Sequence, residues 1–314
     1  MRQSGEASAA VISNDLADVL DSHTRALLRE SAVLMEEWAK LECEIKPQGG
    51  MEEWAKERNV READNCSWYH GTWQYLRLLD MVAVPNWHRE FYNQALGGIL
   101  RKKRRADVLI SAAADYGMLA TLHEAIQIAD AQPNIVVYDI CKTPLRSCQW
   151  YADRHGFSIS IKCGNIITGN IPEAPFDLIV TDEFLTVLKA PYKPAIAERW
   201  RELLKPGGSV VTVAMIGGET TLQLREGYAR RARQLLEMSN GNYLPEKETD
   251  VFKAAIISRF EAFASLHTRH MVRGESEVRS LLSGFDNVSC ARITTPGECV
   301  NPTDSLQIVA SISE

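Results

Sequence analysis

The feature that most constrains the fold of this chain is a regular alternation of apolar strand patterns with helices and turns between residues 106 and 216. The most apolar of these patterns is typical of a central strand in a parallel sheet, which is buried on both faces. Because strand–helix–strand units connect parallel strands by right-handed crossovers, the alternation predicts a doubly wound α/β sheet. Strands are expected at 108–111, 135–138, 158–162, 176–181 and 209–214.

Additional segments surround this α/β unit. Residues 1–105 have helical patterns and are predicted to form a lid or a dimerisation region. Residues 106–314 are predicted to form the main domain, with a helical insert at 217–272 after the fifth strand. Two late strand patterns, at 288–293 and 306–312, bring the expected sheet to seven strands.

Composition limits the class of protein. Of 314 residues, 45% are hydrophobic and 24% charged, which is ordinary for a globular protein, and the formal net charge is −6. An acidic chain is a poor candidate for binding a phosphate backbone, so no nucleic-acid partner is expected. With no apolar run of about 18 residues and no signal peptide at the N-terminus, we expect a cytoplasmic protein with no membrane partner.

The cysteines show no metal or disulfide pattern. Seven are scattered along the chain and none forms a CxxC pair, so we expect reduced thiols and no metal site. Their positions are 43, 66, 141, 148, 163, 290 and 299.

The loop after the first strand reads SAAADYG, at 111–117, where a dinucleotide-binding enzyme would have GxGxxG. An acid, Asp139, nevertheless ends the second strand pattern, where a carboxylate can accept hydrogen bonds from both hydroxyls of a ribose. The pair of observations favours a nucleotide-type cofactor other than a dinucleotide.

Several features in chain order resemble the class I S-adenosylmethionine-dependent methyltransferases. They are the small-residue loop after strand one, the acid ending strand two, Gly164-Asn165-Ile166 after strand three, FDLIVTDEF at strand four, and LLKPGG before strand five. The late strands and the helix pattern before them are similar to the antiparallel hairpin that closes that fold. The resemblance covers roughly 106–216 and 274–314, and its combination of motifs is more specific than any one of them.

The resemblance implies S-adenosyl-L-methionine as the cofactor and assigns residues to it. The first loop would wrap the methionine part, Asp139 would bind the ribose, and Ile140 would pack on the adenine. Asn165 would hydrogen-bond the adenine amino group, with Ile166 beside the ring. The loop residues implied are Ser111, Ala112, Ala113, Asp115, Tyr116 and Gly117, and Thr181 would contact the cofactor at the end of strand four.

The alanines in the loop allow two interpretations. In the favoured one, alanine is tolerated because the loop uses ordinary negative φ values, and Asp115 and Tyr116 add polar contacts to the cofactor. In the other, the site no longer binds cofactor and the domain is a scaffold.

Methyl transfer mainly requires alignment of the acceptor with the methyl carbon, together with removal of a proton from some acceptors. The candidate catalytic residues are Glu183, Asp182 and His70. The alternative for the two acids is that they cap the following helix, and for His70 that it is a histidine of a helix face bonded to its neighbours. Two later histidines, His267 and His270, are expected to be structural or exposed.

The aromatic stretch at 67–92 bears on the acceptor. Its aromatic rings can stabilise a cation, and Arg77 can pair with a carboxylate, which suggests a small, amino-acid-like acceptor methylated on nitrogen or sulfur. The alternative is core packing at helical spacing. The candidate substrate-binding residues are Trp68, Tyr69, Trp73, Tyr75 and Arg77.

Three functions remain open from the sequence. The first is a methyltransferase for a small metabolite, acting as a homodimer through its apolar helical additions. The second is a nucleic-acid or protein methyltransferase, suggested by RKKRR at 101–105. The third is a catalytically silent, methyltransferase-like binding module, suggested by the alanine loop.

Overall fold

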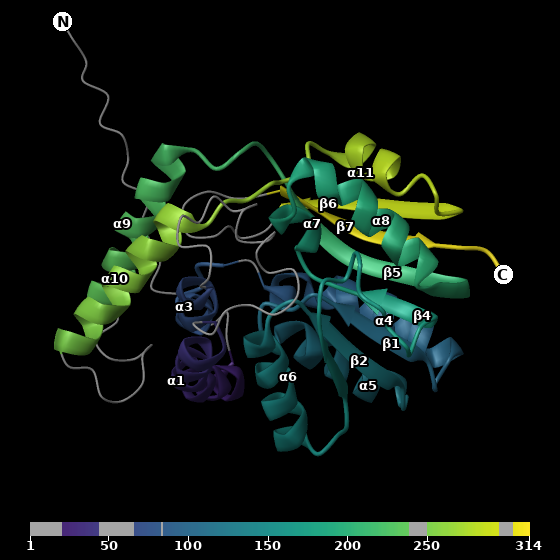
Figure 1. Cartoon of the computed structure of the whole chain (residues 1–314), viewed down its shortest axis with the longest axis horizontal. Coiled ribbons are helices and arrows are strands. Elements are labelled where there is room, and N and C mark those ends of the chain that lie inside the picture. Colours follow the sequence, from purple (N-terminus) through teal and green to yellow (C-terminus); the bar gives the residue numbers. More distant parts are fainter. Residues whose placement is uncertain (1–20, 44–65, 83, 239–249, 295–303) are drawn as a thin grey trace, which may run out of the picture.

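A seven-stranded sheet forms the centre of the computed structural model, which describes residues 21–43, 66–82, 84–238, 250–294 and 304–314 (Figure 1). The strand order is β3-β2-β1-β4-β5-β7-β6, with β7 antiparallel to both of its neighbours and the other pairings parallel. The strands are β1 (Asp107–Ser111), β2 (Asn134–Asp139), β3 (Ser160–Cys163), β4 (Phe176–Val180), β5 (Leu204–Ile216), β6 (Asn287–Thr294) and β7 (Asp304–Ser311).

This order confirms the predicted fold class, a doubly wound, mostly parallel sheet closed by an antiparallel hairpin. One local expectation differs. The LLKPGG motif was expected as the turn before the fifth strand, whereas Leu204 already pairs with Phe176 and the motif lies inside β5. The register between β4 and β5 shifts after this pair, and Gly207, with φ of +76°, supplies the left-handed backbone there.

Each face of the sheet carries its own core because side chains alternate along the strands. On β1, Val108 and Ile110 belong to one core cluster and Leu109 to the other. The first face is covered by α4 (Arg89–Lys102), α5 (Gly117–Ala129) and α6 (Lys142–His155), and the second by α8 (Lys193–Glu202) and α11 (Glu275–Leu281). Three short helices lie in the connections between these elements. They are η2 (Pro85–His88) before α4, and α7 (Phe184–Val187) and η3 (Ala190–Tyr192) between β4 and α8.

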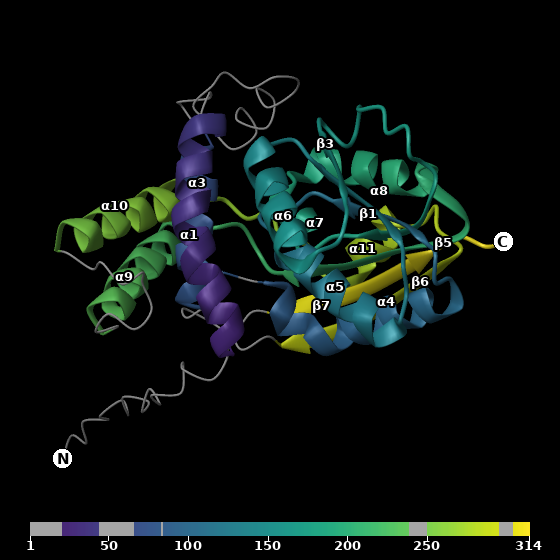
Figure 2. The same cartoon turned by 90° about the horizontal axis from the view of Figure 1, so that it is seen from below.

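Four further helices lie beside the sheet at the end where its parallel strands terminate (Figures 1 and 2). They are α1 (Ser22–Cys43), α3 (Ser67–Leu78), α9 (Leu222–Met238) and α10 (Asp250–Leu266). The first two come from the N-terminal region, the others from the predicted insert after β5. Helix α3 contacts both α1 and α10, and α1 also contacts α6, so the two additions form one layer against the edge of the α/β unit.

An aromatic contact joins α3 to α10. The Phe263 ring stacks on Tyr69 with centroids 5.7 Å apart, on Tyr228 at 5.9 Å and on His267 at 4.7 Å. Phe263 is 1% exposed, so this side of α10 is part of the core of the chain. Among the described residues, no helix combines the length and apolarity that a membrane span requires.

Candidate active site

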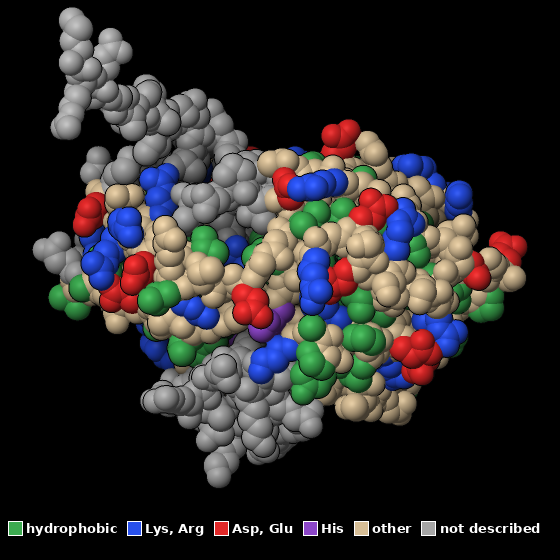
Figure 3. All heavy atoms as spheres, turned by 90° about the horizontal axis from the view of Figure 1, so that it is seen from above, with side chains coloured by type: hydrophobic (Ala, Val, Ile, Leu, Met, Phe, Trp, Pro, Cys, Tyr) green, Lys and Arg blue, Asp and Glu red, His purple; other side chains and the backbone are tan. Residues whose placement is uncertain are grey.

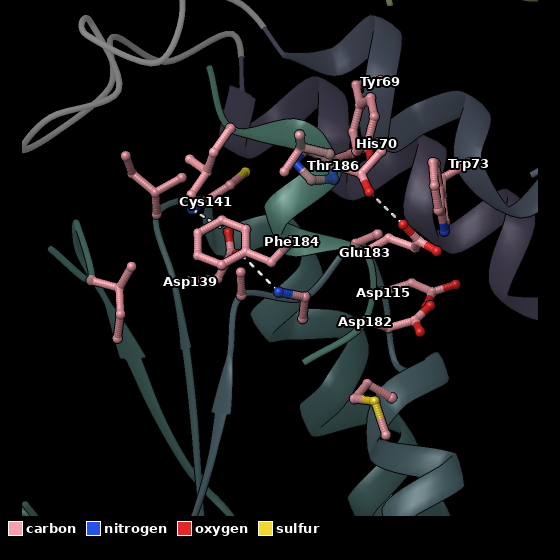
Figure 4. Close-up of a pocket in the computed structure, with 18 of the residues that line it drawn as sticks. Tyr69, His70, Trp73, Asp115, Asp139, Cys141, Asp182, Glu183, Phe184 and Thr186 are labelled. Carbon is pink, nitrogen blue, oxygen red and sulfur yellow. Dashed lines mark hydrogen bonds between the residues drawn. The ribbon is translucent and has the colours of Figure 1, made fainter. Parts of the chain in front are cut away.

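A cavity opens at the carboxyl ends of β1, β2, β3 and β4 and is bounded on its other side by α3 and by the chain after α10 (Figure 4). Between β1 and β4 the strand order reverses direction, and doubly wound sheets bind ligands at such a switch point. The predicted site residues that line the cavity are Tyr69, His70, Trp73, Ala112, Ala113, Asp115, Asp139, Ile140, Asn165, Ile166, Asp182 and Glu183.

The backbone of the first loop corrects one expectation. Ala112 has φ of +67°, in the left-handed region, so the loop does not use ordinary φ values throughout. A non-glycine residue pays about 1–2 kcal/mol for this conformation. The Ala112 N–H donates to the Tyr138 carbonyl at 2.9 Å, and the next amide, of Ala113, donates to the Asp139 carboxylate at 3.0 Å. These bonds hold the loop in the turn that a glycine would adopt more easily.

Asp115 faces the cavity and is held by two donors. Its Oδ2 accepts from Arg77 at 2.5 Å, and its Oδ1 accepts from the Gly117 N–H at 2.6 Å. The Arg77 guanidinium is buried and also lies 5.3 Å from the centroid of the Tyr116 ring. Arg77 is therefore engaged inside the protein and does not line the cavity, which corrects its predicted role as the partner of a substrate carboxylate.

Four other predicted cofactor residues lie behind the cavity wall. Tyr116 is 2% exposed, stacks on Tyr151 with ring centroids 5.1 Å apart, and does not line the cavity where its cofactor contact was expected. The Ser111 hydroxyl accepts from the Trp200 indole at 2.9 Å, on the opposite face of the sheet. Thr181 is fully buried and Gly117 begins α5, and neither lines the cavity.

Asp139, at the end of β2, presents a buried carboxylate to the cavity. One oxygen accepts from the Ala113 N–H and the other from the Cys141 N–H, at 2.7 Å for the latter. Burial raises the pKa of Asp139 to about 8, and these two hydrogen bonds act in the opposite direction. A carboxylate has about four acceptor positions, so two remain for hydroxyl groups of a ligand.

The loop after β3 forms the adjacent wall. Asn165 uses its side-chain oxygen to accept from the Ile167 N–H at 2.9 Å, which makes a local turn, and Ile166 presents an apolar side chain. A side chain on Gly164 or Gly169 would collide with the Tyr138 hydroxyl, at 2.4 Å and 2.0 Å from the added carbon. The ring of Tyr138 thus requires glycine at both positions, and this fixes the loop against β2.

Two acids follow β4. The Asp182 carboxylate accepts from the Tyr92 hydroxyl at 2.6 Å. Burial raises the pKa of Asp182 to about 7; the nearby Asp115 adds to the rise, and the Tyr92 hydrogen bond and the Arg77 charge oppose it. Figure 4 shows the carboxylates of Asp115 and Asp182 close together at one side of the cavity.

Glu183 has a structural role, although its side chain makes no capping hydrogen bond to the following helix, which was the alternative considered. It has φ of +54° and is the N-terminal flanking residue of α7. Its carboxylate accepts from the Thr186 hydroxyl at 2.5 Å and from the Met215 N–H at 2.9 Å, tying α7 to β5 (Figure 4). Both hydrogen bonds of the Glu183 carboxylate are therefore made within the protein.

The acceptor side of the cavity carries an aromatic roof, defined here as Tyr69, Trp73, Phe263 and His267. Tyr69, Trp73 and His267 line the cavity, and Phe263 supports them from behind. His70 is 5% exposed and lines the cavity too, and its Nδ1 has no hydrogen-bond partner among the described residues. The expectation that His267 is structural or exposed is therefore incomplete, because it also faces the cavity.

Two of the predicted substrate-binding aromatic residues do not line the cavity. The Tyr75 hydroxyl donates to Glu36 of α1 at 3.1 Å, and its ring is fully buried away from the cavity. Trp68 packs on Phe263 with centroids 5.9 Å apart and does not line the cavity. Both follow the alternative interpretation of the aromatic stretch, which was core packing at helical spacing.

Sequence reasoning missed part of the lining. The additional residues are Cys66, Val82, Val84, Pro85, Ala114, Met118, Tyr138, Cys141, Gly164, Ile167, Phe184, Thr186, Val187, Leu188, Met215 and Arg269. Phe184 is the last residue of the strand-four motif FDLIVTDEF and Thr186 lies two residues later, so their position next to the predicted acids could have indicated them. Arg269 lies 158 positions after Ser111 in the chain, and no motif marks it.

No family model and no curated protein sequence matches this chain. Among solved structures, it is similar to the N-methyltransferase NodS from Bradyrhizobium japonicum in complex with S-adenosyl-L-homocysteine. The identity is 14% and the TM-score 0.43, over 85% of this chain and 100% of that one. It is also similar to 1,6-didemethyltoxoflavin-N1-methyltransferase from Burkholderia thailandensis, with 1,6-didemethyltoxoflavin and S-adenosylhomocysteine bound. That identity is 14% and the TM-score 0.45, over 71% of this chain and 79% of that one.

TehB from Haemophilus influenzae is a further similar structure, at 13% identity and a TM-score of 0.42 over 70% of this chain. The present chain spans 62% of the length of TehB.

Proposed function

We propose that this protein is an S-adenosylmethionine-dependent methyltransferase that acts on a small, amino-acid-like metabolite. The observation that carries the proposal is a cavity at the switch point of the sheet. The cavity is lined by the buried acid Asp139, whose position suits a ribose, by a second acid, Asp182, and by the aromatic roof. A ligand with a ribose at one end and a reacting group at the other fits this order of residues.

The residues present fit S-adenosylmethionine along the cavity. The two free acceptor positions of Asp139 suit the two ribose hydroxyls, and Ile140 and Ile166 offer apolar surface for the adenine. Asp115 provides negative charge for the ammonium group of the methionine part. When bound, the cofactor supplies a methyl group attached to a sulfonium, which is a good leaving group.

The protein's own contribution is placement and proton removal. Asp182, with its pKa raised to about 7, can take a proton from an acceptor amine near neutral pH. Tyr69 and Trp73 offer ring faces to a cationic acceptor or product. His70 is a second candidate base because it lines the same cavity. The roof closes the acceptor side, which favours a small molecule over a polymer.

The surface offers further support for a small acceptor. On the face shown in Figure 3, basic and acidic side chains are interspersed and do not gather in one basic field. The chain as a whole has a formal net charge of −6. A nucleic-acid substrate would instead be served by clustered Lys and Arg.

Calorimetric titration with S-adenosylmethionine and S-adenosylhomocysteine tests the cofactor. Asp139→Ala should weaken both affinities about 10- to 100-fold, because each of the two ribose hydrogen bonds that it removes contributes about 0.5–1.5 kcal/mol. The matched control is Asp153→Ala, an exposed acid on α6, which should bind as the unmodified protein does. Equal loss in both variants, or no binding by the unmodified protein at millimolar cofactor, would contradict the assignment.

A transfer assay with labelled cofactor tests the acceptor. Pools of amino acids and small amines are compared with total RNA and with denatured cell protein. Label in a small-molecule pool is the expected result. Label in RNA or protein would establish the second function considered above, and cofactor binding without any transfer would indicate a silent binding module.

A further inference from the structure

Three cysteines from separate parts of the chain meet at one edge of the cavity. The Sγ of Cys141 lies 3.7 Å from that of Cys43 and 3.7 Å from that of Cys66. All three sulfur atoms lie within 4.8 Å of one another, and the three residues are between 0% and 2% exposed. None of them is disulfide-bonded in this structure.

The spacing matches that of thiolates around one metal ion. Zinc binds cysteine sulfur at about 2.3 Å in a tetrahedral arrangement, which separates neighbouring sulfurs by about 3.8 Å. A disulfide would need one pair at about 2.05 Å and would leave the third thiol unused. The cluster therefore has the distances of a trithiolate site before any side chain moves.

Two of these cysteines lie where a helix begins. Cys66 is the N-terminal flanking residue of the twelve-residue helix α3, and Cys141 that of the fourteen-residue helix α6. Two of the three cysteines, Cys66 and Cys141, line the cavity, so an ion has a route to the site from solvent.

We propose that Cys43, Cys66 and Cys141 bind one zinc ion, with the fourth coordination position left to solvent in the cavity. The ion would join the end of α1 and the start of α3 to the turn after β2, two residues from Asp139. It thereby fixes the N-terminal helices over the cofactor end of the cavity. This inference rests on the sulfur positions and stands whether or not the chain transfers methyl groups.

The test is metal content of the full chain, purified under reducing conditions, incubated with zinc and dialysed against metal-free buffer. About one zinc per chain is expected. Cys43→Ser, Cys66→Ser and Cys141→Ser should each retain little or none. The matched control is Cys290→Ser on β6, outside the cluster, which should retain the same zinc as the unmodified protein.

A second measurement guards against misfolded variants. The unmodified protein is loaded with cobalt in place of zinc, and its absorption spectrum should show thiolate-to-cobalt charge-transfer bands that zinc then removes. Circular dichroism of each variant checks its helix content. The proposal is overturned if the unmodified protein holds no zinc and shows no such bands, or if all three variants keep the ion. It is also overturned if two of the three cysteines remain joined by a disulfide after reduction and metal loading.

Discussion

The Arg77 guanidinium and the Asp115 carboxylate form an ion pair at 2.5 Å with both side chains about 95% buried, at 4% and 5% exposure. Arg77 comes from α3 and Asp115 from the loop after β1, so the pair ties the N-terminal helices to this loop. Asp115 and Asp182 both line the cavity, where Asp115 raises the pKa of Asp182 and the charge of Arg77 lowers it.

Breaking this pair should destabilise the protein strongly. Arg77→Met leaves the Asp115 carboxylate buried without its cation, which costs about 3–5 kcal/mol in comparable pairs. Arg89→Met is the control: Arg89 pairs with Glu124 at the surface, at 64% and 30% exposure, and such pairs contribute about 0–1 kcal/mol. Urea denaturation measures both free energies of unfolding. Similar small losses for the two variants would show that Arg77 does not hold the loop.

Glycine at position 112 should stabilise the loop. Ala112→Gly removes the strain of a positive φ, about 1–2 kcal/mol, and loses part of this to the greater flexibility of the unfolded chain, so a net gain of about 0.5–1 kcal/mol is expected. Ala114→Gly, in the same loop at negative φ, should instead cost about 0.5–1 kcal/mol. The two shifts in unfolding free energy must have opposite signs; a loss at position 112 would refute the explanation.

Activity should depend on the ionisation of Asp182. As a base it works only when deprotonated, so kcat/KM should rise as pH increases through about 7 and level off above it, given its raised pKa. Asp182→Asn should abolish this limb of the profile. The Tyr92 hydroxyl favours the charged form, so Tyr92→Phe should move the limb to higher pH. A profile unchanged in either variant would assign the base elsewhere, with His70 the next candidate.

The aromatic roof should affect acceptor binding more than cofactor binding. Phe263→Leu removes the support behind Tyr69 and His267, and an aromatic contact contributes about 0.5–1.5 kcal/mol, so the KM for the acceptor should rise about 2- to 10-fold. The same change at Phe252, on the same helix but packed on Tyr75 outside the cavity, is the control. Steady-state kinetics with calorimetric cofactor affinities separates the two effects. A rise in KM for both variants would point to a general loss of α10.

Local patterns were sufficient for the elements of the fold. Apolar periodicity located the strands to within one or two residues for β1, β2 and β4, because buried strands in a parallel sheet must be apolar along their length. The start of β5 was displaced, since Leu204 joins the sheet ahead of a proline and two glycines, which normally indicate a turn. The twelve lining residues found in advance all belong to strand ends or to one helix face.

Contacts between residues far apart in the sequence could not be predicted from such local patterns. Arg77 was predicted to bind a substrate carboxylate. Nothing in the sequence indicates that it pairs with Asp115, 38 positions later in the chain. Cysteines 43, 66 and 141 looked unrelated for the same reason, since they form no motif along the chain and meet only when α1, α3 and α6 dock. The sequence by itself determined the sheet, the acid that ends β2 and the loop after β1 that lacks the expected glycines, because these depend on neighbours within a few residues. The tertiary structure decided which charges are satisfied inside the protein, which aromatic rings face the cavity and which thiols touch, because burial and contact are properties of the packed chain.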